Sequence, residues 1–258
     1  MGAMKVDPAS TPTTRMLRLT VSTRTTGETV TARVDSPASA AVPVRAQRRP
    51  RVPGLLLAHG ANNDLDHPLL ASLAGQLARD GVATVLRFNF PYAERGSTSP
   101  DARPVLEDTF RRAYHLLVHE LLEPGTPVFL GGKSLGGRFA AEFVSGGIEG
   151  EALPADGLVV LGYPLHAPGR RDRPNVRPLE GIRVPSLFLL GTRDPFCEPE
   201  SLEPILAALP YPGRLHVVDG GDHSFVLPKS SGRDPHDAHD EVGAQVAAFI
   251  REVAGAAA

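Results

Sequence analysis

Residues 127–138 read Pro-Val-Phe-Leu-Gly-Gly-Lys-Ser-Leu-Gly-Gly-Arg, and they carry the strongest structural signal in the chain. The apolar run at 128–130 predicts a buried strand, and the residues after Ser134 predict the start of a helix. Between them, Gly132, Ser134 and Gly136 form a Gly-x-Ser-x-Gly pattern, which is typical of a nucleophilic serine on a sharp strand-to-helix turn. Glycines suit the flanking positions because the chain folds tightly there and substrate passes close to the backbone.

The Gly-Lys-Ser of residues 132–134 is also the end of a phosphate-binding P-loop. That motif requires a glycine five residues before the glycine of Gly-Lys-Ser, and here Pro127 occupies that position. An apolar strand fills the space where the loop would lie, so the backbone amides that would hold phosphate are paired in a sheet. The pattern therefore favours a nucleophile turn over a nucleotide site.

The composition fits one large domain. The chain has 258 residues, of which 41% are hydrophobic, enough for a core covered on both faces. The formal net charge of −2 argues against nucleic-acid binding in general. Cys197 is the only cysteine, which excludes an internal disulfide and a zinc site built from cysteines.

The N-terminal residues and the absence of long apolar runs indicate where in the cell the protein is found. No segment approaches the length of a membrane span. Residues 1–14 are polar, rich in Pro, Thr and Ser, and lack the apolar core of a signal peptide. We therefore expect a cytoplasmic protein that does not bind membranes, with a disordered leader at 1–14 and a single domain over 15–258. The oligomeric state stays open.

Two patterns of hydrophobicity divide the chain. Residues 16–21 and 29–34 alternate apolar and polar side chains on either side of Gly27-Glu28, which predicts an antiparallel hairpin. Later, short apolar runs alternate with helical segments. The predicted strands are 54–58, 83–88, 127–131, 157–161, 186–190 and 215–218. The predicted helices are 68–79, 106–122, 135–144, 201–209 and 240–253.

Such alternation predicts an α/β fold in which a mostly parallel, twisted sheet of about eight strands is covered by helices on both faces. Ligands of these sheets bind beyond the carboxyl ends of the strands. No insertion is long enough to form a large lid, and the best lid candidate is the polar segment 163–184, which includes Arg170, Arg171, Arg173 and Arg177.

A base and an acid for the nucleophile are expected at the same edge of the sheet. His223 follows the strand at 215–218 in a glycine-rich loop, and a histidine titrates near neutral pH, as a general base must. Asp194 follows the strand at 186–190 and lies between Ser134 and His223 in sequence, where the orienting acid is expected. Asp222 and Asp219 are alternatives for the acid.

An oxyanion hole requires two backbone N–H groups. One comes from the residue after the nucleophile, Leu135, at the start of a helix whose dipole favours negative charge. The second is expected from the turn after the first parallel strand, at residues 59–62, where we assign the Ala61 N–H. His59 in that turn has a structural role in this interpretation.

Three further residues are candidates for binding substrate. Asn62 lies in the turn that carries Ala61, and Arg87 and Tyr92 lie at or beyond the end of the strand at 83–88. Arg87 and Tyr92 could line a pocket for a carboxylate or another polar group. The alternative is that Arg87, with Asn89, braces the loops from below, and the sequence leaves both interpretations open.

Other reactive residues have simpler interpretations. Lys133 adjoins Ser134 but points in another direction on a tight turn, so we expect it to form a salt bridge or a structural hydrogen bond. Cys197 is expected to be a packed side chain. His115 and His119 are four residues apart on one helix face, but no third ligand is evident, so the sequence predicts no metal and no cofactor.

Four strings of this sequence are distinctive when taken together. They are Leu-Arg-Phe-Asn-Phe-Pro-Tyr at 86–92, Gly-Gly-Lys-Ser-Leu-Gly-Gly-Arg at 131–138, Gly-Thr-Arg-Asp-Pro-Phe at 191–196 and Gly-Asp-His-Ser-Phe at 221–225. With them, about residues 52–254 resemble the α/β-hydrolase superfamily, on its dienelactone-hydrolase-like side. More narrowly, the strings resemble a subgroup that includes a testis-expressed animal protein and a subunit of a histone-acetyltransferase complex.

The resemblance implies that Ser134, Asp194 and His223 form a catalytic triad. Dienelactone hydrolases proper have cysteine at the nucleophile position, so the serine here argues against dienelactone as substrate. The expected function is hydrolysis of a small carboxylic ester or thioester through an acyl-enzyme on Ser134. The alternative is a non-catalytic interaction module on the same fold, with a vestigial site.

Overall fold

The computed structural model describes residues 11–22, 27–38, 51–147, 152–211, 213–234 and 237–256. Most of the predicted leader, residues 1–10, lies outside these ranges. The first strand begins at Thr13, so the last two residues of that leader belong to the sheet.

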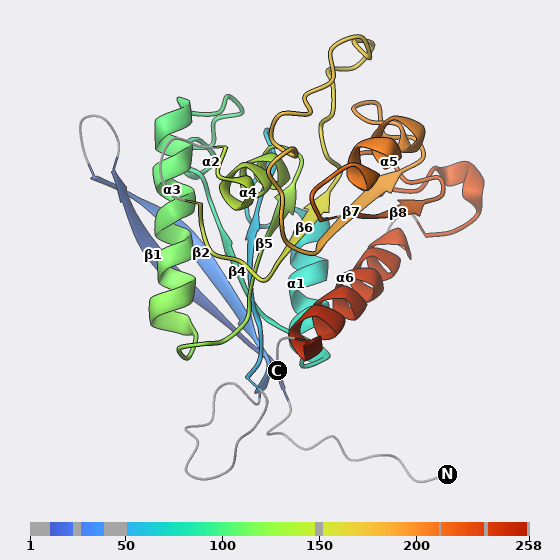
Figure 1. Ribbon diagram of the computed structural model, residues 1–258. Helices are drawn as coiled ribbons and strands as arrows, with labels where there is room; N and C mark the ends of the chain where they lie inside the picture. Colours follow the sequence, from blue (N-terminus) through green and yellow to red (C-terminus); the bar gives the residue numbers. More distant parts are fainter. Residues whose placement is uncertain are drawn as a thin grey trace, which may run out of the picture.

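One eight-stranded sheet forms the centre of the molecule, in the order β1-β2-β4-β3-β5-β6-β7-β8 (Figure 1). β1 pairs with β2, and β2 with β4, in antiparallel fashion; every other pair is parallel. The strands are β1 Thr13–Ser22, β2 Gly27–Ser36, β3 Gly54–Ala58, β4 Thr84–Phe88, β5 Val128–Lys133, β6 Gly157–Leu161, β7 Ser186–Gly191 and β8 Arg214–Val218. The prediction of a mostly parallel sheet of about eight strands is confirmed.

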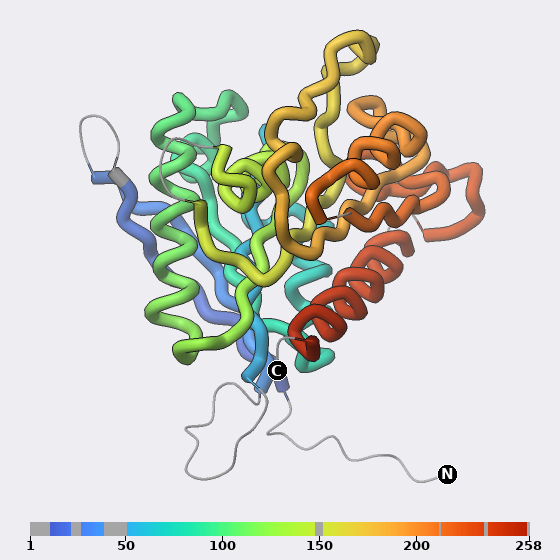
Figure 2. Tube along the Cα trace, viewed as in Figure 1, coloured from blue at the N-terminus to red at the C-terminus, as the bar shows by residue number. Residues whose placement is uncertain are grey.

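Helices cover both faces of the sheet, as Figure 2 shows along the Cα trace. They are α1 Pro68–Arg79, α2 Pro91–Glu94, α3 Arg103–Leu116, α4 Leu135–Ser145, α5 Pro199–Ala207 and α6 Asp237–Ala256. α1 and α6 pack together on one face, where Leu73 and Val246 share a core with Leu57 of the sheet. α3, α4 and α5 lie on the other face, where Phe110 and Phe139 pack into a second core.

The parallel strands are apolar on both faces because helices cover both. All five residues of β3 and all five of β6 are buried. An uninterrupted apolar run is the expected pattern for such strands. In the β1–β2 hairpin, apolar and polar residues alternate instead. The register of this hairpin runs from Thr13 opposite Ser36 to Ser22 opposite Gly27.

Several helix ends differ from the sequence prediction: α5 begins and ends two residues earlier, and α6 is three residues longer at each end. α3 begins at Arg103 rather than 106, with Pro104 in its first turn, and it continues as a π-helical turn at Leu117–Leu121. A proline at the start of a helix loses no backbone hydrogen bond, since the first N–H groups have no partner there. The short helix α2 was not predicted; it also begins with a proline, Pro91.

The segment 163–184 contains no helix or strand. Its buried residues Leu179 and Ile182 pack into the core on the side of α4. The fold therefore lacks a separate lid. Among the described residues, no helix has both the length and the apolar character needed to span a bilayer.

Candidate active site

The turn between β5 and α4 presents Ser134. Its backbone has φ 52° and ψ −115°, a conformation that residues with a side chain rarely adopt. Strain of this kind costs about 1–3 kcal/mol and is typical of functional sites. The Ser134 N–H donates to the carbonyl of Leu161, at the end of β6, with a distance of 2.9 Å. The neighbouring strand thus holds the turn in place.

The glycines of the motif allow the turn to pack against β3. A methyl group on Gly132 would lie 2.7 Å from the carbonyl oxygen of Ala58. A methyl group on Gly136 would overlap the same oxygen. Only glycine fits at either position without moving the β3 backbone. The Gly-x-Ser-x-Gly pattern therefore reflects close backbone approach, as the sequence indicated.

The structure brings His223 and Asp194 together. His223 Nδ1 lies 2.7 Å from Asp194 Oδ2, and the Asp194 side chain is fully buried while that of His223 is 17% exposed. The other carboxylate oxygen of Asp194 accepts the Phe196 N–H at 2.9 Å. Because Nδ1 faces a carboxylate, it carries the proton in the neutral ring, and Nε2 is left as the basic nitrogen.

The alternative acids have other partners. Asp222 Oδ1 accepts the backbone N–H groups of Ser224 at 2.7 Å and Val226 at 3.0 Å, so this carboxylate organises the loop that carries His223. Asp219 accepts the hydroxyl of Thr192 at 3.4 Å. Neither contacts the imidazole, and of the three candidates only Asp194 does.

Gly162 connects the His–Asp pair to the nucleophile turn. It follows Leu161, which holds the Ser134 backbone, and it has φ 63°. A Cβ at this position would lie 3.1 Å from His223 Nδ1 and 3.3 Å from Asp194 Oδ2. The imidazole and Ser134 therefore border the same end of β6, although no hydrogen bond joins them in this structure. Catalytic hydrogen bonds are often long before substrate binds.

The turn after β3 is held by two donors to one carbonyl. His59 Nδ1 lies 2.8 Å from the Gly60 oxygen, and the Tyr92 hydroxyl donates to the same oxygen at 3.0 Å. His59 Nε2 accepts the Phe90 N–H at 3.0 Å. A Cβ on Gly60 would lie 3.2 Å from Ser134 Cβ, so this turn adjoins Ser134.

The chemistry of His59 is structural, as the sequence indicated. Its ring is fully buried, and burial lowers its pKa to about 4, with the Gly60 hydrogen bond opposing this effect. The ring is therefore neutral near pH 7. Its Nδ1–H donates to the Gly60 oxygen, and its Nε2 is taken by Phe90. It cannot take up a proton on Nε2 without losing the hydrogen bond that Nε2 accepts from Phe90.

The predicted substrate-binding residues separate into two groups. Asn62 is exposed in the turn beside Ala61, with φ 57°. Tyr92 is fully buried, and its hydroxyl donates a hydrogen bond to the Gly60 carbonyl, so its side chain supports the turn. The expectation that Tyr92 lines a substrate pocket is not supported by this placement, because its only polar group has a partner inside the protein.

Arg87 is also buried and paired inside the protein. It is 3% exposed, and its guanidinium donates to Asp35 Oδ2 at 2.8 Å and to the Leu65 carbonyl at 2.6 Å. The Leu65 N–H in turn donates to Asn89 Oδ1 at 2.8 Å. Of the two interpretations left open, the structure favours the one in which Arg87 and Asn89 brace the loop after β3.

Lys133 is buried next to Ser134, on the last position of β5. Burial lowers the pKa of its ammonium group, an effect that the charges of Asp194 and Asp222 oppose. The expected salt bridge or hydrogen bond is absent: with the described residues its ammonium forms neither.

Cys197 is a packed side chain, whereas His115 and His119 are exposed. Cys197 is buried, and burial raises the pKa of its thiol to about 12, which keeps it protonated and unreactive. The rings of His115 and His119 stack with their centres 5.5 Å apart. No group of three or more metal-ligating side chains occurs in the described parts of the chain.

Sequence reasoning missed two neighbours of the imidazole. The Phe196 ring lies 4.4 Å from that of His223, centre to centre, and a Cβ on Gly162 would lie 3.1 Å from His223 Nδ1. Phe196 and Gly162 both follow predicted strands, so the sequence could have placed them at the carboxyl edge of the sheet. It could not have shown that they lie beside His223, which belongs to another loop.

Comparison with known proteins agrees with this architecture. Residues 51–251 match a family described as alpha/beta hydrolase domain. A serine hydrolase without a lid from Xanthomonas campestris is 18% identical, with 90% of this chain and 94% of that chain covered and a TM-score of 0.62. Dienelactone hydrolase from Anabaena variabilis is also 18% identical, covering 93% and 98%, with a TM-score of 0.65.

Est1E from Butyrivibrio proteoclasticus is 12% identical, covering 92% of this chain and 98% of that chain, with a TM-score of 0.63. At these identities the solved structures establish a common fold and no more. The family match covers most of the chain, and the sheet order and strand-to-helix turn agree with it. This chain therefore belongs to the family of alpha/beta hydrolase domains.

Proposed function

We propose that this protein is a serine hydrolase that cleaves a small carboxylic ester or thioester through an acyl-enzyme on Ser134. One observation carries the proposal: a buried carboxylate holds the His223 imidazole at 2.7 Å beside a strained serine turn. Membership of a hydrolase family and the serine hydrolase from Xanthomonas campestris on the same fold support it.

The proposed reaction begins with Ser134 Oγ attacking the acyl carbon. His223 Nε2 takes the hydroxyl proton, and the imidazolium that forms is stabilised by Asp194, whose carboxylate accepts Nδ1–H. The tetrahedral intermediate then collapses, and His223 gives its proton to the leaving alcohol or thiol. Water repeats the sequence and releases the acid.

The oxyanion would be held by the N–H groups of Leu135 and Ala61. Leu135 is the first residue of α4, where the helix dipole favours negative charge. The second donor is oriented through its own peptide group. In a trans peptide the carbonyl and the next N–H point in opposite directions. Because His59 and Tyr92 hold the Gly60 carbonyl on the buried side, the Ala61 N–H points the other way.

Several narrower expectations accompany this proposal. Asn62, exposed beside Ala61, is the remaining predicted residue that could contact substrate. The four strings at 86–92, 131–138, 191–196 and 221–225 support placement in the subgroup with the testis-expressed protein and the acetyltransferase-complex subunit. We also propose a cytoplasmic location, a small-molecule substrate, and no nucleic-acid or membrane partner.

The test is a panel of p-nitrophenyl esters and matched thioesters of increasing acyl length, assayed with wild type and Ser134→Ala. We expect turnover with a clear optimum of acyl length, reduced to background in the variant. If the folded wild type turns over no member of the panel, or Ser134→Ala matches it, the ester hydrolase proposal fails. The interaction module would then be the better account.

A further inference from the structure

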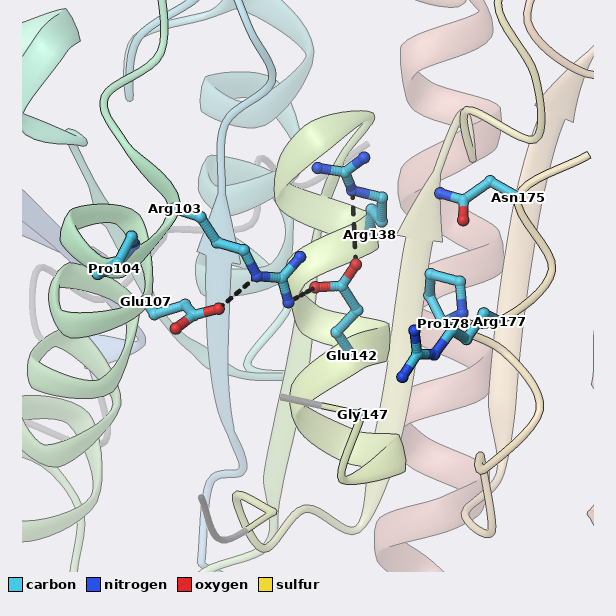
Figure 3. Close-up of a pocket in the computed structure, with 9 residues that line it drawn as sticks. All are labelled: Arg103, Pro104, Glu107, Arg138, Glu142, Gly147, Asn175, Arg177 and Pro178. Carbon is cyan, nitrogen blue, oxygen red and sulfur yellow. Dashed lines mark hydrogen bonds and ion pairs between the residues drawn. The ribbon is translucent and has the colours of Figure 1, made fainter. Parts of the chain in front are cut away.

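A polar pocket lies over the outer side of α4, apart from the nucleophile turn (Figure 3). Its volume is about 550 Å³, within the range that accepts small organic ligands. It runs along the helix from Arg138, one turn after Ser134, to Gly147 beyond the helix end. The lining residues are Arg103, Pro104, Glu107, Arg138, Glu142, Gly147, Asn175, Arg177 and Pro178.

The pocket carries three arginines and two glutamates, so it has an excess of positive charge. Both glutamates are engaged by one arginine. Arg103 Nε lies 2.6 Å from Glu107, and Arg103 Nη2 lies 2.7 Å from Glu142, as the dashed lines in Figure 3 show. Among the described residues, the positive charges of the other two lining arginines, Arg138 and Arg177, therefore have no carboxylate at hydrogen-bond distance to balance them.

Arg138 has only a distant carboxylate. Its Nε lies 3.7 Å from Glu142 Oε1, beyond hydrogen-bond length, and this buried nitrogen has no hydrogen-bond partner. Glu142 gives its shorter contact to Arg103. A guanidinium has five N–H donors, and within the described chain those of Arg138 find no acceptor at hydrogen-bond distance.

Arg177 contrasts with Arg170, Arg171 and Arg173 of its segment, which form ion pairs. Arg170 and Arg173 contact Asp172, and Arg171 contacts Glu198 at 2.5 Å. Arg177 is exposed, borders the pocket and forms no ion pair or hydrogen bond with any residue that the structure describes. Of the arginines in the segment 163–184, it is the one that lines the pocket.

We propose that this pocket binds the anionic group of a small organic acid, a carboxylate or a phosphate ester, between Arg138 and Arg177. The planar fork of a guanidinium matches the paired oxygens of either group. The Asn175 amide borders the same space and offers further N–H donors, while Pro104 and Pro178 provide apolar walls for the rest of the ligand (Figure 3). The proposal does not depend on the hydrolytic reaction.

The test uses the full chain with Ser134→Ala, so that turnover cannot remove the probe. Benzoate, phenyl phosphate and neutral benzamide are titrated by calorimetry and by NMR of the arginine Nε–H signals. We expect saturable binding of at least one anion and none of benzamide. The stronger of the two anions identifies the acidic group, and added salt weakens binding.

Arg177→Gln in that background should weaken anion binding at least about tenfold, since charged hydrogen bonds are lost. Arg173→Gln is the matched control: it removes an exposed arginine from the same segment but outside the pocket, and binding should be unchanged. Arg138→Gln should repeat the loss, with thermal unfolding as a check of folding. Absence of saturable anion binding, equal binding of benzamide, or undiminished binding by Arg177→Gln would overturn the proposal.

Discussion

Replacing Gly162 with alanine tests whether the His223–Asp194 pair acts in catalysis. Gly162 has φ 63°, and a residue with a Cβ pays about 1–2 kcal/mol in this left-handed region. The added methyl would also lie 3.1 Å from His223 Nδ1 and 3.3 Å from Asp194 Oδ2. Both distances are shorter than ordinary van der Waals contact with carbon, so the imidazole and carboxylate must move by a few tenths of an ångström.

We expect kcat/KM for p-nitrophenyl acetate to fall about ten- to a hundredfold, because small displacements of a catalytic group have effects of this size. The midpoint of thermal unfolding should fall by about 2–8 °C, since each kcal/mol shifts a domain of this size by about 2–4 °C. The two readouts together separate loss of activity from loss of folded protein.

Gly81→Ala is the matched control. Gly81 has φ 66°, close to that of Gly162, but a Cβ there would meet nothing within 4 Å. It should lose comparable thermal stability and keep wild-type kcat/KM. If Gly162→Ala is folded and as active as Gly81→Ala, the pair at 223 and 194 does not act in the reaction, and the reasoning is refuted.

Three other changes have defined outcomes. Asp194→Asn should lower kcat by about 10³–10⁴-fold in the ester assay with an unchanged circular dichroism spectrum, because an amide no longer enforces the Nδ1–H tautomer; near-normal kcat would contradict this. Tyr92→Phe removes the donor to the Gly60 oxygen, so urea unfolding should show a loss of about 1 kcal/mol, and kcat should fall more than KM rises; an unchanged kcat would show that the bond does not orient the turn. Burial lowers the pKa of His59 to about 4 from an ordinary 6.5, so the unfolded chain binds the proton more readily, and stability should decline as pH falls from about 6.5 to about 4. Burial also lowers the pKa of His67, so part of this decline should remain in His59→Gln. In that variant the urea midpoint should fall less steeply with decreasing pH than in wild type. An identical slope in the two proteins would contradict the assignment to His59.

The sequence was informative wherever local pattern and backbone sterics decide structure. Strands β3 and β6 are uninterrupted apolar runs, and their bounds agree with the prediction. The Gly-x-Ser-x-Gly turn could be predicted because Gly132 and Gly136 are required by backbone contact with β3. The chain order of serine, acid and histidine placed Asp194 and His223 on loops that do meet.

Contacts between distant elements could not be predicted. Asp35 and Arg87 are 52 positions apart, and they meet because β2 and β4 pair in antiparallel register with Asp35 opposite Val85. Nothing near Arg87 in sequence signals this partner, so a substrate role and a bracing role looked equal. The pocket over α4 likewise needs α3 and the segment at 175–178 to lie on either side of one helix.

The most direct measurement is covalent labelling by a fluorophosphonate, with the modified residue located by mass spectrometry of the digested protein. The account predicts a single adduct on the peptide that carries Ser134, slowed strongly in His223→Ala and absent in Ser134→Ala. A folded wild-type protein that remains unlabelled, or that is labelled at another residue, would contradict it.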